Sequence, residues 1–253
     1  MLTAIVLTLN EERHLPDCLT SLAWTDEVVV FDSFSTDATV TLAEQAGARV
    51  IQHPFENYAR QRNAALEAVP EAEWVLFVDA DERIPPPLAE EIRAATRAGQ
   101  AVAAWIPRHN YIFGRLTRHA GWFPDFQLRL LKNGKVRYDR DRPVHELALV
   151  DGPTVHLAHP MVHLNYATVR EFVVKQHYYA EYDAQILFQE GRRVRPWNYI
   201  LQPPRHFWWR FVTLQGWHHG FHGLRLSLLM AYFQLVLYQR LKALEVGVSE
   251  NRT

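Results

Sequence analysis

The sequence is poor in cysteine, has no excess of either charge, and contains no glycine before Gly47. Its single cysteine, Cys18, allows no disulfide within the chain, which fits a reducing compartment such as the bacterial cytoplasm. A formal net charge of −1 provides no basic field of the kind that attracts nucleic acids. The late first glycine argues against a glycine-rich phosphate loop directly after the first strand, and therefore against a nucleotidyltransferase.

The sequence also predicts neither a signal peptide nor a membrane-spanning segment. No charged leader precedes a short apolar run at the N-terminus, so we expect no signal peptide. Residues 221–238 are mostly apolar, but a stretch of eighteen residues that contains Arg225 falls short of a membrane span.

Cys18 lies in a helical pattern, where we expect a small buried apolar residue and not a nucleophile.

The N-terminal half alternates apolar stretches with helical patterns. These predict strands at 4–9, 27–31, 48–52 and 74–78, and helices at 14–23, 38–46 and 58–69. Strands that are apolar throughout are typical of a parallel sheet that helices cover on both faces. A chain of 253 residues can bury a full core, and one large domain with an appendage is expected.

Polar residues cluster where three of the predicted strands end. They are Thr8, Asn10 and Glu11 after the first strand, Asp32, Ser33 and Ser35 after the second, and Asp79, Asp81 and Glu82 after the fourth. Open α/β sheets bind ligands at this edge. The three acids of the last cluster repel one another unless a cation joins them, and their oxygen ligands suit Mg2+ or Mn2+. A solvated acidic turn is the alternative for these acids taken alone.

Four segments in this order resemble the nucleotide-sugar-binding half of family 2 glycosyltransferases with the GT-A fold: LTLNEE at 7–12, DSFSTDAT at 32–39, QRNAAL at 61–66 and VDADE at 78–82. The segments GWFPDFQLRL at 121–130 and VHE at 144–146 resemble the acceptor side of one branch, the bacterial lipopolysaccharide-core glucosyltransferases. One position departs from the family pattern, because Phe34 stands where the wider family has glycine, so the loop backbone is expected to differ.

The resemblance implies a role for each matching residue. Thr8, Asn10 and Glu11 would lie beside the nucleoside, and Asp32, followed by Ser33, would accept a hydrogen bond from the pyrimidine ring. Arg62, beside Asn63, would reach the phosphates, and Arg129 is a further candidate phosphate contact. Asp79 and Ala80 would face the ribose and the metal shell, Asp81 would bind the metal, and His163 would touch the diphosphate or the metal. A helix N-terminal cap is the alternative for Asp32.

Two carboxylates compete for the role of base. Inversion at the anomeric carbon needs a group that takes the proton of the acceptor hydroxyl. Glu146 follows a charged loop, as an acceptor-facing segment should, and we rank it before Asp125. Gln127 and Arg129 alternate with apolar residues on a predicted strand, so they share a face with Asp125. A strand-edge acid paired to an arginine is the alternative for Glu146.

The C-terminal third mixes arginines with aromatic residues. Residues 192–210 contain five arginines and three tryptophans, and the apolar stretch 221–238 follows. This composition favours a helical appendage that attaches to a membrane surface, and a helix packed on the catalytic core is the alternative. Pro203 and Pro204 are expected to break the helix before the aromatic segment.

Patterns and resemblance together predict an α/β protein: a GT-A, Rossmann-like, mostly parallel sheet flanked by helices in 1–165, and a helical membrane-associating region in 166–253. The implied activity is inverting, metal-dependent transfer of glucose from UDP-glucose to a saccharide or glycolipid acceptor, the lipopolysaccharide inner core. Polyprenyl phosphate or an exopolysaccharide intermediate is an alternative acceptor, and a silent nucleotide- and lipid-binding protein is an alternative function. The expected location is peripheral, on the cytoplasmic face of the inner membrane.

Overall fold

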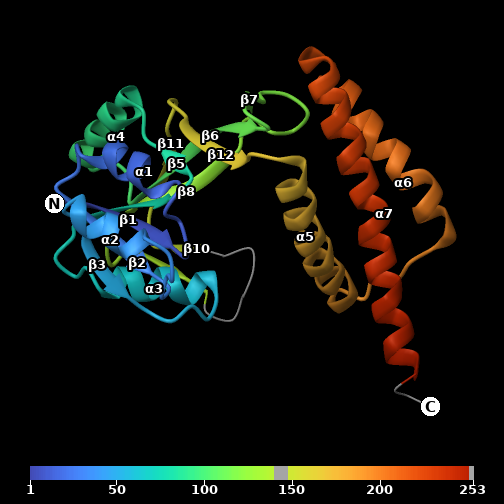
Figure 1. The fold of residues 1–253 in the computed structure, drawn as a ribbon, viewed down its shortest axis with the longest axis horizontal. Helices are drawn as coiled ribbons and strands as arrows, with labels where there is room; N and C mark the ends of the chain where they lie inside the picture. The colour runs from blue at the N-terminus through green and yellow to red at the C-terminus, as the bar shows by residue number, and fades with distance from the viewer. Residues whose placement is uncertain (140–147, 251–253) are drawn as a thin grey trace. The chain divides into compact units, whose positions relative to one another are not determined.

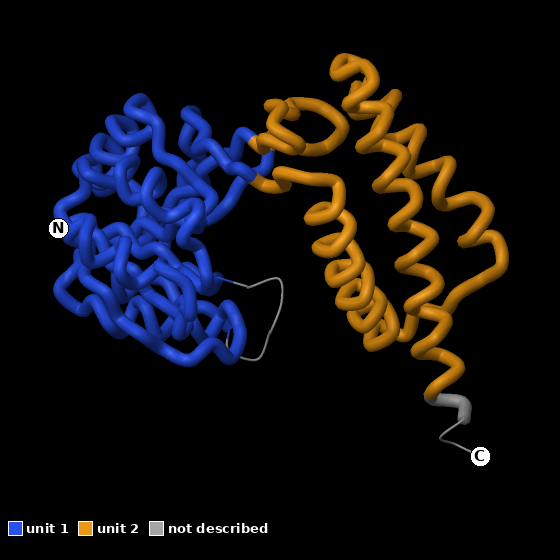
Figure 2. Tube along the Cα trace, viewed as in Figure 1, with its two compact units in different colours: residues 1–109, 125–164 blue, residues 110–124, 165–253 orange. Residues whose placement is uncertain are grey.

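The computed structural model describes residues 1–139 and 148–250, of which 248–250 are described by their backbone alone (Figure 1). The chain divides into two compact units, residues 1–109 with 125–164, and residues 110–124 with 165–253 (Figure 2). The sequence suggested one boundary at residue 165. The structure also assigns 110–124 to the second unit, because hydrogen bonds tie this segment to the helical region. The Arg210 guanidinium donates to the Ala120 carbonyl oxygen at 2.6 Å, and the Ala120 N–H donates to the Leu214 carbonyl oxygen at 2.8 Å.

The first unit begins with the parallel strands that the sequence predicts. They are β1 (Leu2–Thr8), β2 (Glu27–Asp32), β3 (Arg49–Gln52) and β4 (Trp74–Asp79), in the spatial order β3-β2-β1-β4. The helices between them are α1 (Leu15–Leu22), α2 (Thr39–Gln45) and α3 (Tyr58–Glu67). The prediction of an α/β fold with parallel strands is confirmed for this half.

Antiparallel strands extend the sheet beyond β4. The order continues β8-β6-β12-β5, with β8 (Phe126–Lys132), β6 (Ala103–Ile112), β12 (Met161–Tyr166) and β5 (Glu82–Arg83). The short strands are β7 (Arg115–Leu116) and β11 (Thr154–His156), which pair with β6, and β9 (Val136–Tyr138) and β10 (Ala148–Val150), which pair with each other. The β5–β12 pairing sets Glu82 opposite His163 and so carries the chain after β4 back to β12.

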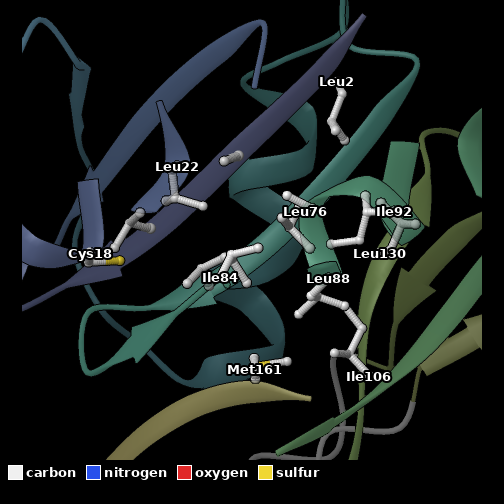
Figure 3. Packing of buried hydrophobic residues seen from close by; sticks show 14 of the residues in the cluster. Leu2, Cys18, Leu22, Leu76, Ile84, Leu88, Ile92, Ile106, Leu130 and Met161 are labelled. Carbon is white, nitrogen blue, oxygen red and sulfur yellow. The ribbon is translucent and has the colours of Figure 1, made fainter. Parts of the chain in front are cut away.

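Two apolar cores cover the two faces of the sheet. One packs α1 and α4 (Pro86–Ala98) against residues such as Leu76 and Leu130, and the other packs α3 against residues such as Phe77. Cys18 lies in the first core beside Leu22 and Ile84, as Figure 3 shows. Burial raises the pKa of the Cys18 thiol above its usual range, which confirms the expected packing role.

The second unit is built from long helices around its own core. The helices are α5 (Val169–Gln189), α6 (Pro196–Trp208), the π-helix η1 (Trp209–Thr213), the 3-10 helix η2 (Gly216–His219) and α7 (Phe221–Glu250). Phe172 of α5 and Leu226, Phe233 and Val236 of α7 meet in its core. None of the helices in the described part of the chain combines the length and apolar character that a membrane crossing needs.

The predicted break at Pro203 and Pro204 is wrong, because both prolines lie inside α6. Each proline removes an N–H donor, so two helical hydrogen bonds are missing in mid-helix. Packing along α7 holds α6 together, since Tyr199 donates its hydroxyl to the Tyr238 carbonyl oxygen at 3.2 Å. The helix changes to wider π-helical turns only after Trp208.

Candidate active site at the carboxyl edge of the sheet

The ends of β1, β2 and β4 bring the predicted polar clusters to one edge of the sheet. Thr8 pairs in register with Asp32, and Leu7 pairs with Asp79. The Thr8 hydroxyl donates to Asp32 Oδ1 at 2.9 Å, and both side chains are buried. The period-two side-chain alternation and the common strand direction place these groups together, as the sequence indicated.

Asp32 organises the loop that follows β2. Besides Thr8, its carboxylate accepts the Ser35 N–H at 2.8 Å and the Gln52 side-chain amide at 3.2 Å, and the Ser35 hydroxyl also donates to it. The Asp32 side chain is fully buried and holds four donors of its own chain. It caps no helix by itself, because the N–H of Thr39, at the start of α2, donates to Asp37 at 3.0 Å.

The loop after β1 interlocks with the loop after β2. Asn10 Oδ1 accepts the Thr36 N–H at 2.8 Å, and the Asn10 N–H donates to the Ser35 hydroxyl at 2.8 Å. The Glu11 N–H donates to the Thr39 hydroxyl at 2.8 Å, and the Ser33 hydroxyl accepts the Gln61 amide at 3.1 Å. The two loops therefore form one hydrogen-bonded platform.

Phe34 adopts a backbone conformation that favours glycine. Its φ is +61°, in the left-handed region, and its ring is 53% exposed. The phenylalanine that departs from the family pattern thus occupies a conformation that a glycine adopts without steric cost. Its exposed ring contributes an apolar surface to this edge of the sheet that a glycine lacks.

Helix α3 places the side chains of Arg62 and Asn63 in the interior of the first unit, where both are buried. Arg62 stacks on the Phe77 ring, with its guanidinium carbon 4.9 Å from the ring centroid, and its Nη2 lies 3.6 Å from Asp79 Oδ1. Asn63 donates its amide to the Tyr138 carbonyl oxygen and accepts the Tyr138 N–H, both at 2.8 Å. The structure thus gives Asn63 a structural contact that secures β9, while Arg62 stands beside Asp79.

Acids and arginines alternate through the centre of the site. Arg129 binds both oxygens of Asp79 and donates to Glu82 Oε1 at 2.8 Å. Arg108 Nη1 lies 3.4 Å from the same Glu82 oxygen, and its Nη2 lies 2.7 Å from Asp125 Oδ2. Glu82 is fully buried, and its other oxygen accepts the Asp79 N–H at 2.9 Å. Glu82 therefore links the end of β4 to Arg108 and, through Arg108, to Asp125 before β8.

These arginines supply the positive charge that the acidic cluster requires. Burial opposes ionisation of Asp79, but the guanidinium groups of Arg129 and Arg62 outweigh it and hold the pKa of that carboxyl well below its usual range. The same pairing raises the pKa of Arg129 against the opposing effect of burial. Both groups are therefore charged at neutral pH, and the Arg129 guanidinium predicted for a phosphate holds Asp79 and Glu82 in this structure.

Asp81 and His163 form a separate pair at this edge. His163 Nε2 lies 3.4 Å from Asp81 Oδ2, and the His163 ring is almost fully buried. Ala80 between the two aspartates is buried, and its carbonyl oxygen accepts from Arg83 at 2.7 Å. Within the described residues, no group of three or more His, Cys, Asp or Glu side chains would hold a metal by itself. One carboxylate and one imidazole fit a divalent ion that takes its remaining ligands from a diphosphate and water.

Of the two predicted bases, the structure describes one. Glu146 lies outside the described residues. Asp125 is 27% exposed; its Oδ2 accepts from Arg108 Nε at 2.9 Å and its Oδ1 accepts the Gln127 amide at 2.9 Å. The predicted shared face of Asp125 and Gln127 is thus present, and Arg108 holds the carboxylate toward Glu82.

Sequence reasoning missed Arg108 as a member of the site and Glu82 as its buried centre. A signal for Arg108 exists, because an arginine interrupts the otherwise apolar start of AAWIPRHNYI in β6. An arginine in such a strand needs a buried anion as its partner. Which anion it meets depends on the β6–β8 pairing, which the sequence does not display.

Comparisons with known proteins agree with this fold. A family model described as glycosyl transferase family 2 matches residues 3–146, more than half of the chain. The chain is 29% identical to the lipopolysaccharide core biosynthesis glycosyltransferase LpsC of Rhizobium meliloti, over 94% of this chain and 92% of that protein. It is 26% identical to an uncharacterised glycosyltransferase of Rickettsia felis, over 95% and 89%.

One solved structure shows the shared fold. Glucosyl-3-phosphoglycerate synthase from Mycobacterium tuberculosis, in complex with phosphoglyceric acid, superposes with a TM-score of 0.50 at 18% identity, over 77% of this chain and 81% of that one. The predicted GT-A architecture is therefore confirmed. With the family model spanning most of the first unit, the chain belongs to glycosyl transferase family 2 and is a glycosyltransferase.

Proposed function

We propose that the protein transfers glucose from UDP-glucose, with inversion, to a saccharide of the lipopolysaccharide inner core. The Asp81–His163 pair beside the arginine-bound Asp79 carries this proposal, because it offers a nucleoside diphosphate a metal position next to fixed positive charge. The similarity to LpsC along nearly the whole chain supports the choice of acceptor.

The donor would lie across the platform of the first two loops. The nucleoside would lie, as the family resemblance implies, beside Thr8, Asn10, Glu11, Asp32 and Ser33. The Asp32 carboxylate already accepts four hydrogen bonds, so its main role would be to fix the shape of this pocket. The pyrimidine ring would contact the edge of the carboxylate. Arg62 is the cation placed to meet a phosphate, since it reaches Asp79 at 3.6 Å, a distance that leaves room for closer contacts.

Asp81 and His163 would hold Mg2+ or Mn2+. The His163 ligand atom comes from β12 and the Asp81 ligand atom from the turn between β4 and β5, so the β5–β12 pairing fixes their separation. When bound there, the divalent ion would offset the negative charge that builds on the departing diphosphate. Arg62 and Arg129 keep Asp79 ionised beside this position and so contribute a fixed electrostatic environment.

A carboxylate would accept the proton of the acceptor hydroxyl. The acceptor oxygen forms its bond to the anomeric carbon while the bond to the diphosphate oxygen breaks, and the hydroxyl proton passes to the base. Our sequence ranking places Glu146 before Asp125. The contacts of Arg108 support this order, because its Nε and Nη2 lie 2.9 and 2.7 Å from Asp125 Oδ2 and so engage that carboxylate with a cation.

A transfer assay with paired variants tests the base. Glu146→Gln should keep donor binding and lose roughly two to four orders of magnitude in transfer rate. Asp125→Asn, which keeps the size of the side chain and loses its charge, is the matched comparison. If Asp125→Asn shows that loss and Glu146→Gln stays active, the assignment of the base is reversed.

A panel of nucleotide sugars tests the donor. Thermal shifts with and without Mn2+ should single out UDP-glucose, since a ligand that binds only the folded state raises its stability. Transfer to isolated lipopolysaccharide core acceptors, compared with polyprenyl phosphate and an exopolysaccharide intermediate, tests the acceptor. A protein that shifts with UDP-sugars but transfers to none of these acceptors would fit the catalytically silent alternative.

We also propose a peripheral location on the cytoplasmic face of the inner membrane. The donor is a cytosolic metabolite class, and a glycolipid acceptor is confined to the membrane. An enzyme that joins the two gains from residence at the surface between them. The second unit, residues 165–253 with 110–124, is the candidate attachment region.

A further inference from the structure

Helix α6 presents its apolar side outward. Trp197, Leu201, Trp208 and Val212 recur at steps of four and seven residues, which places them on one side of the helix that α6 and η1 form. Their exposed fractions are 51%, 59%, 63% and 37%, and the neighbouring Ile200 is 71% exposed. No residue of α6, all of which the structure describes, is buried. We call these five residues the α6 stripe.

The other side of α6 faces α7 and carries half-buried side chains of both kinds, such as Tyr199, Gln202 and Phe207. The Tyr199 hydroxyl donates to the Tyr238 carbonyl oxygen, and His206 Nε2 accepts from Arg210 Nε at 2.9 Å. A surface helix of a globular protein in water turns polar residues outward, whereas α6 turns the apolar residues of the α6 stripe outward. An exposed apolar stripe of this kind marks an interaction surface.

A cavity lined by arginines lies at the start of the same helix. Its volume is about 460 Å3, and its lining residues are Gly191, Arg192, Arg193, Arg195, Trp197 and Asn198. The Arg195 guanidinium carbon lies 5.3 Å from the centroid of the Trp197 ring. Guanidinium groups donate paired hydrogen bonds to phosphate oxygens, so this cavity suits a phosphate group. Trp197 belongs to the cavity and to the α6 stripe, which makes the two features continuous.

The charge of this region selects its partner. Residues 191–244 contain eight arginine and lysine residues and no aspartate or glutamate. The carboxylate of the next residue, Glu245, accepts the Val194 N–H and interacts with Arg193 and Lys242, so the region keeps a net positive charge. A second copy of the chain would bring the same positive charge to the contact and would be repelled. An anionic lipid leaflet attracts the arginines through its phosphates and accepts the tryptophans at the level of its headgroups.

We propose that the α6 stripe and the arginine cavity together form a lipid-binding face, with a lipid phosphate in the cavity and the stripe among the acyl chains just below it. This inference deepens the proposed membrane location and rests on it. The α6 axis then lies in the plane of the leaflet, as for interfacial amphipathic helices. The lipid that this face requires is anionic, because Arg192, Arg193 and Arg195 all line the cavity.

Flotation of the 253-residue chain with phosphatidylcholine vesicles, with and without phosphatidylglycerol, tests the proposal. Replacing Arg192, Arg193 and Arg195 by glutamine should weaken binding to the anionic vesicles roughly a hundredfold, since each basic residue near an anionic surface strengthens binding about fivefold. The matched control replaces three exposed arginines elsewhere, Arg60, Arg97 and Arg170, by glutamine and removes the same charge. It should lose much less binding.

A second variant separates the apolar contribution from the charge. Ile200→Ser, Leu201→Ser and Trp208→Ser together should abolish the binding that persists at high salt, because screening weakens only the electrostatic part. Val174→Ser with Tyr178→Ser, on an exposed side of α5, is the control and should leave binding unchanged.

Three outcomes would overturn the proposal. They are the absence of flotation with every vesicle composition, equal losses in the arginine variant and its control, and a concentration-dependent dimer in sedimentation that the serine variant abolishes. Competition by inorganic phosphate that removes all vesicle binding would assign the cavity to a free anion instead of a lipid. Transfer to a soluble, delipidated core oligosaccharide, measured in parallel, should be equal in all variants, so a failure here is distinct from a failure of the proposed glycosyl transfer.

Discussion

Glu82→Gln should destabilise the first unit far more than its small change in shape suggests. Glu82 is fully buried, and its carboxylate is shared by Arg129 at 2.8 Å, Arg108 at 3.4 Å and the Asp79 N–H at 2.9 Å. Glutamine keeps the size of the side chain but removes the negative charge. Arg129, itself 4% exposed, then keeps only Asp79 as its charged partner within this cluster.

The structure sets the magnitude of this effect. Removing one partner of a buried ion pair costs about 3–5 kcal/mol, because the other charge stays buried without compensation. That is a large part of the roughly 5–15 kcal/mol by which a domain is stable. For a chain of this size each kcal/mol lowers the melting temperature by about 2–4 °C, so the loss should be roughly 6–20 °C.

Scanning calorimetry of the whole chain measures the effect, with Glu71→Gln as the matched control. Glu71 makes an arginine contact of the same kind, 2.8 Å from Arg49, but both side chains are exposed by more than 40%. Exposed pairs contribute little to stability, so Glu71→Gln should leave the melting temperature unchanged. Equal melting temperatures for the two variants would refute the reasoning, because they would show that burial of Glu82 does not decide its contribution.

Three further predictions concern the metal position, the second unit and its helix packing. Asp81→Asn should nearly abolish transfer and the Mn2+-dependent part of the UDP-glucose thermal shift. The melting temperature of the unliganded protein should stay unchanged. Full transfer by this variant in metal-free buffer would contradict the proposed metal role. Burial lowers the pKa of both His206 and His222 to about 4, so as pH falls the unfolded state binds protons at these residues before the folded state does. The free energy of unfolding should therefore fall as pH drops from about 6.5 to about 4. Urea titrations across this range measure the slope, which His222→Gln should reduce. Gly223→Ala should destabilise the second unit by at least about 1–3 kcal/mol, because the new Cβ would lie 1.8 Å from a backbone carbonyl oxygen. The Cβ of Gly247→Ala meets nothing within 4 Å, so this variant should stabilise α7 by about 0.5–1 kcal/mol. Similar melting curves for the two alanine variants would contradict the packing described for α7.

Local patterns in the sequence determined the first half of the fold. Four apolar stretches became β1, β2, β3 and β4, and the helical patterns between them became α1, α2 and α3, with ends that differ by a few residues. Such patterns succeed because a fully buried parallel strand must be apolar throughout, and because neighbouring parallel strands end at the same edge. The sequence therefore places the polar residues after β1, β2 and β4 together.

The family resemblance also came from the sequence alone. The ordered segments LTLNEE, QRNAAL and VDADE indicated a family 2 glycosyltransferase, and the family model over residues 3–146 confirms it. The sequence did not predict the loop conformation, because the backbone was expected to differ where Phe34 replaces glycine. Phe34 was singled out as a departure, and it adopts the φ of +61° that favours glycine at that point.

Only the tertiary structure decided which charges meet. Glu82, Arg108 and Arg129 come from three strands, and their contacts depend on the β8–β6 and β5–β12 pairings. The sequence showed three acids that need a cation, and tertiary structure supplied arginines for Asp79 and Glu82 and a histidine for Asp81. Pairing between strands distant in sequence carries no local period, so no pattern along the chain displays it.

Tertiary structure also decided how the second unit uses its aromatic residues. The composition of 192–210 indicated a membrane surface, but the outward direction of Trp197, Leu201 and Trp208 follows from the packing of α6 on α7. The same packing keeps Pro203 and Pro204 inside a helix that they were expected to break. The side of α6 that faces solvent is settled by its neighbours, because the pattern of apolar residues along a helix would by itself turn its apolar stripe inward.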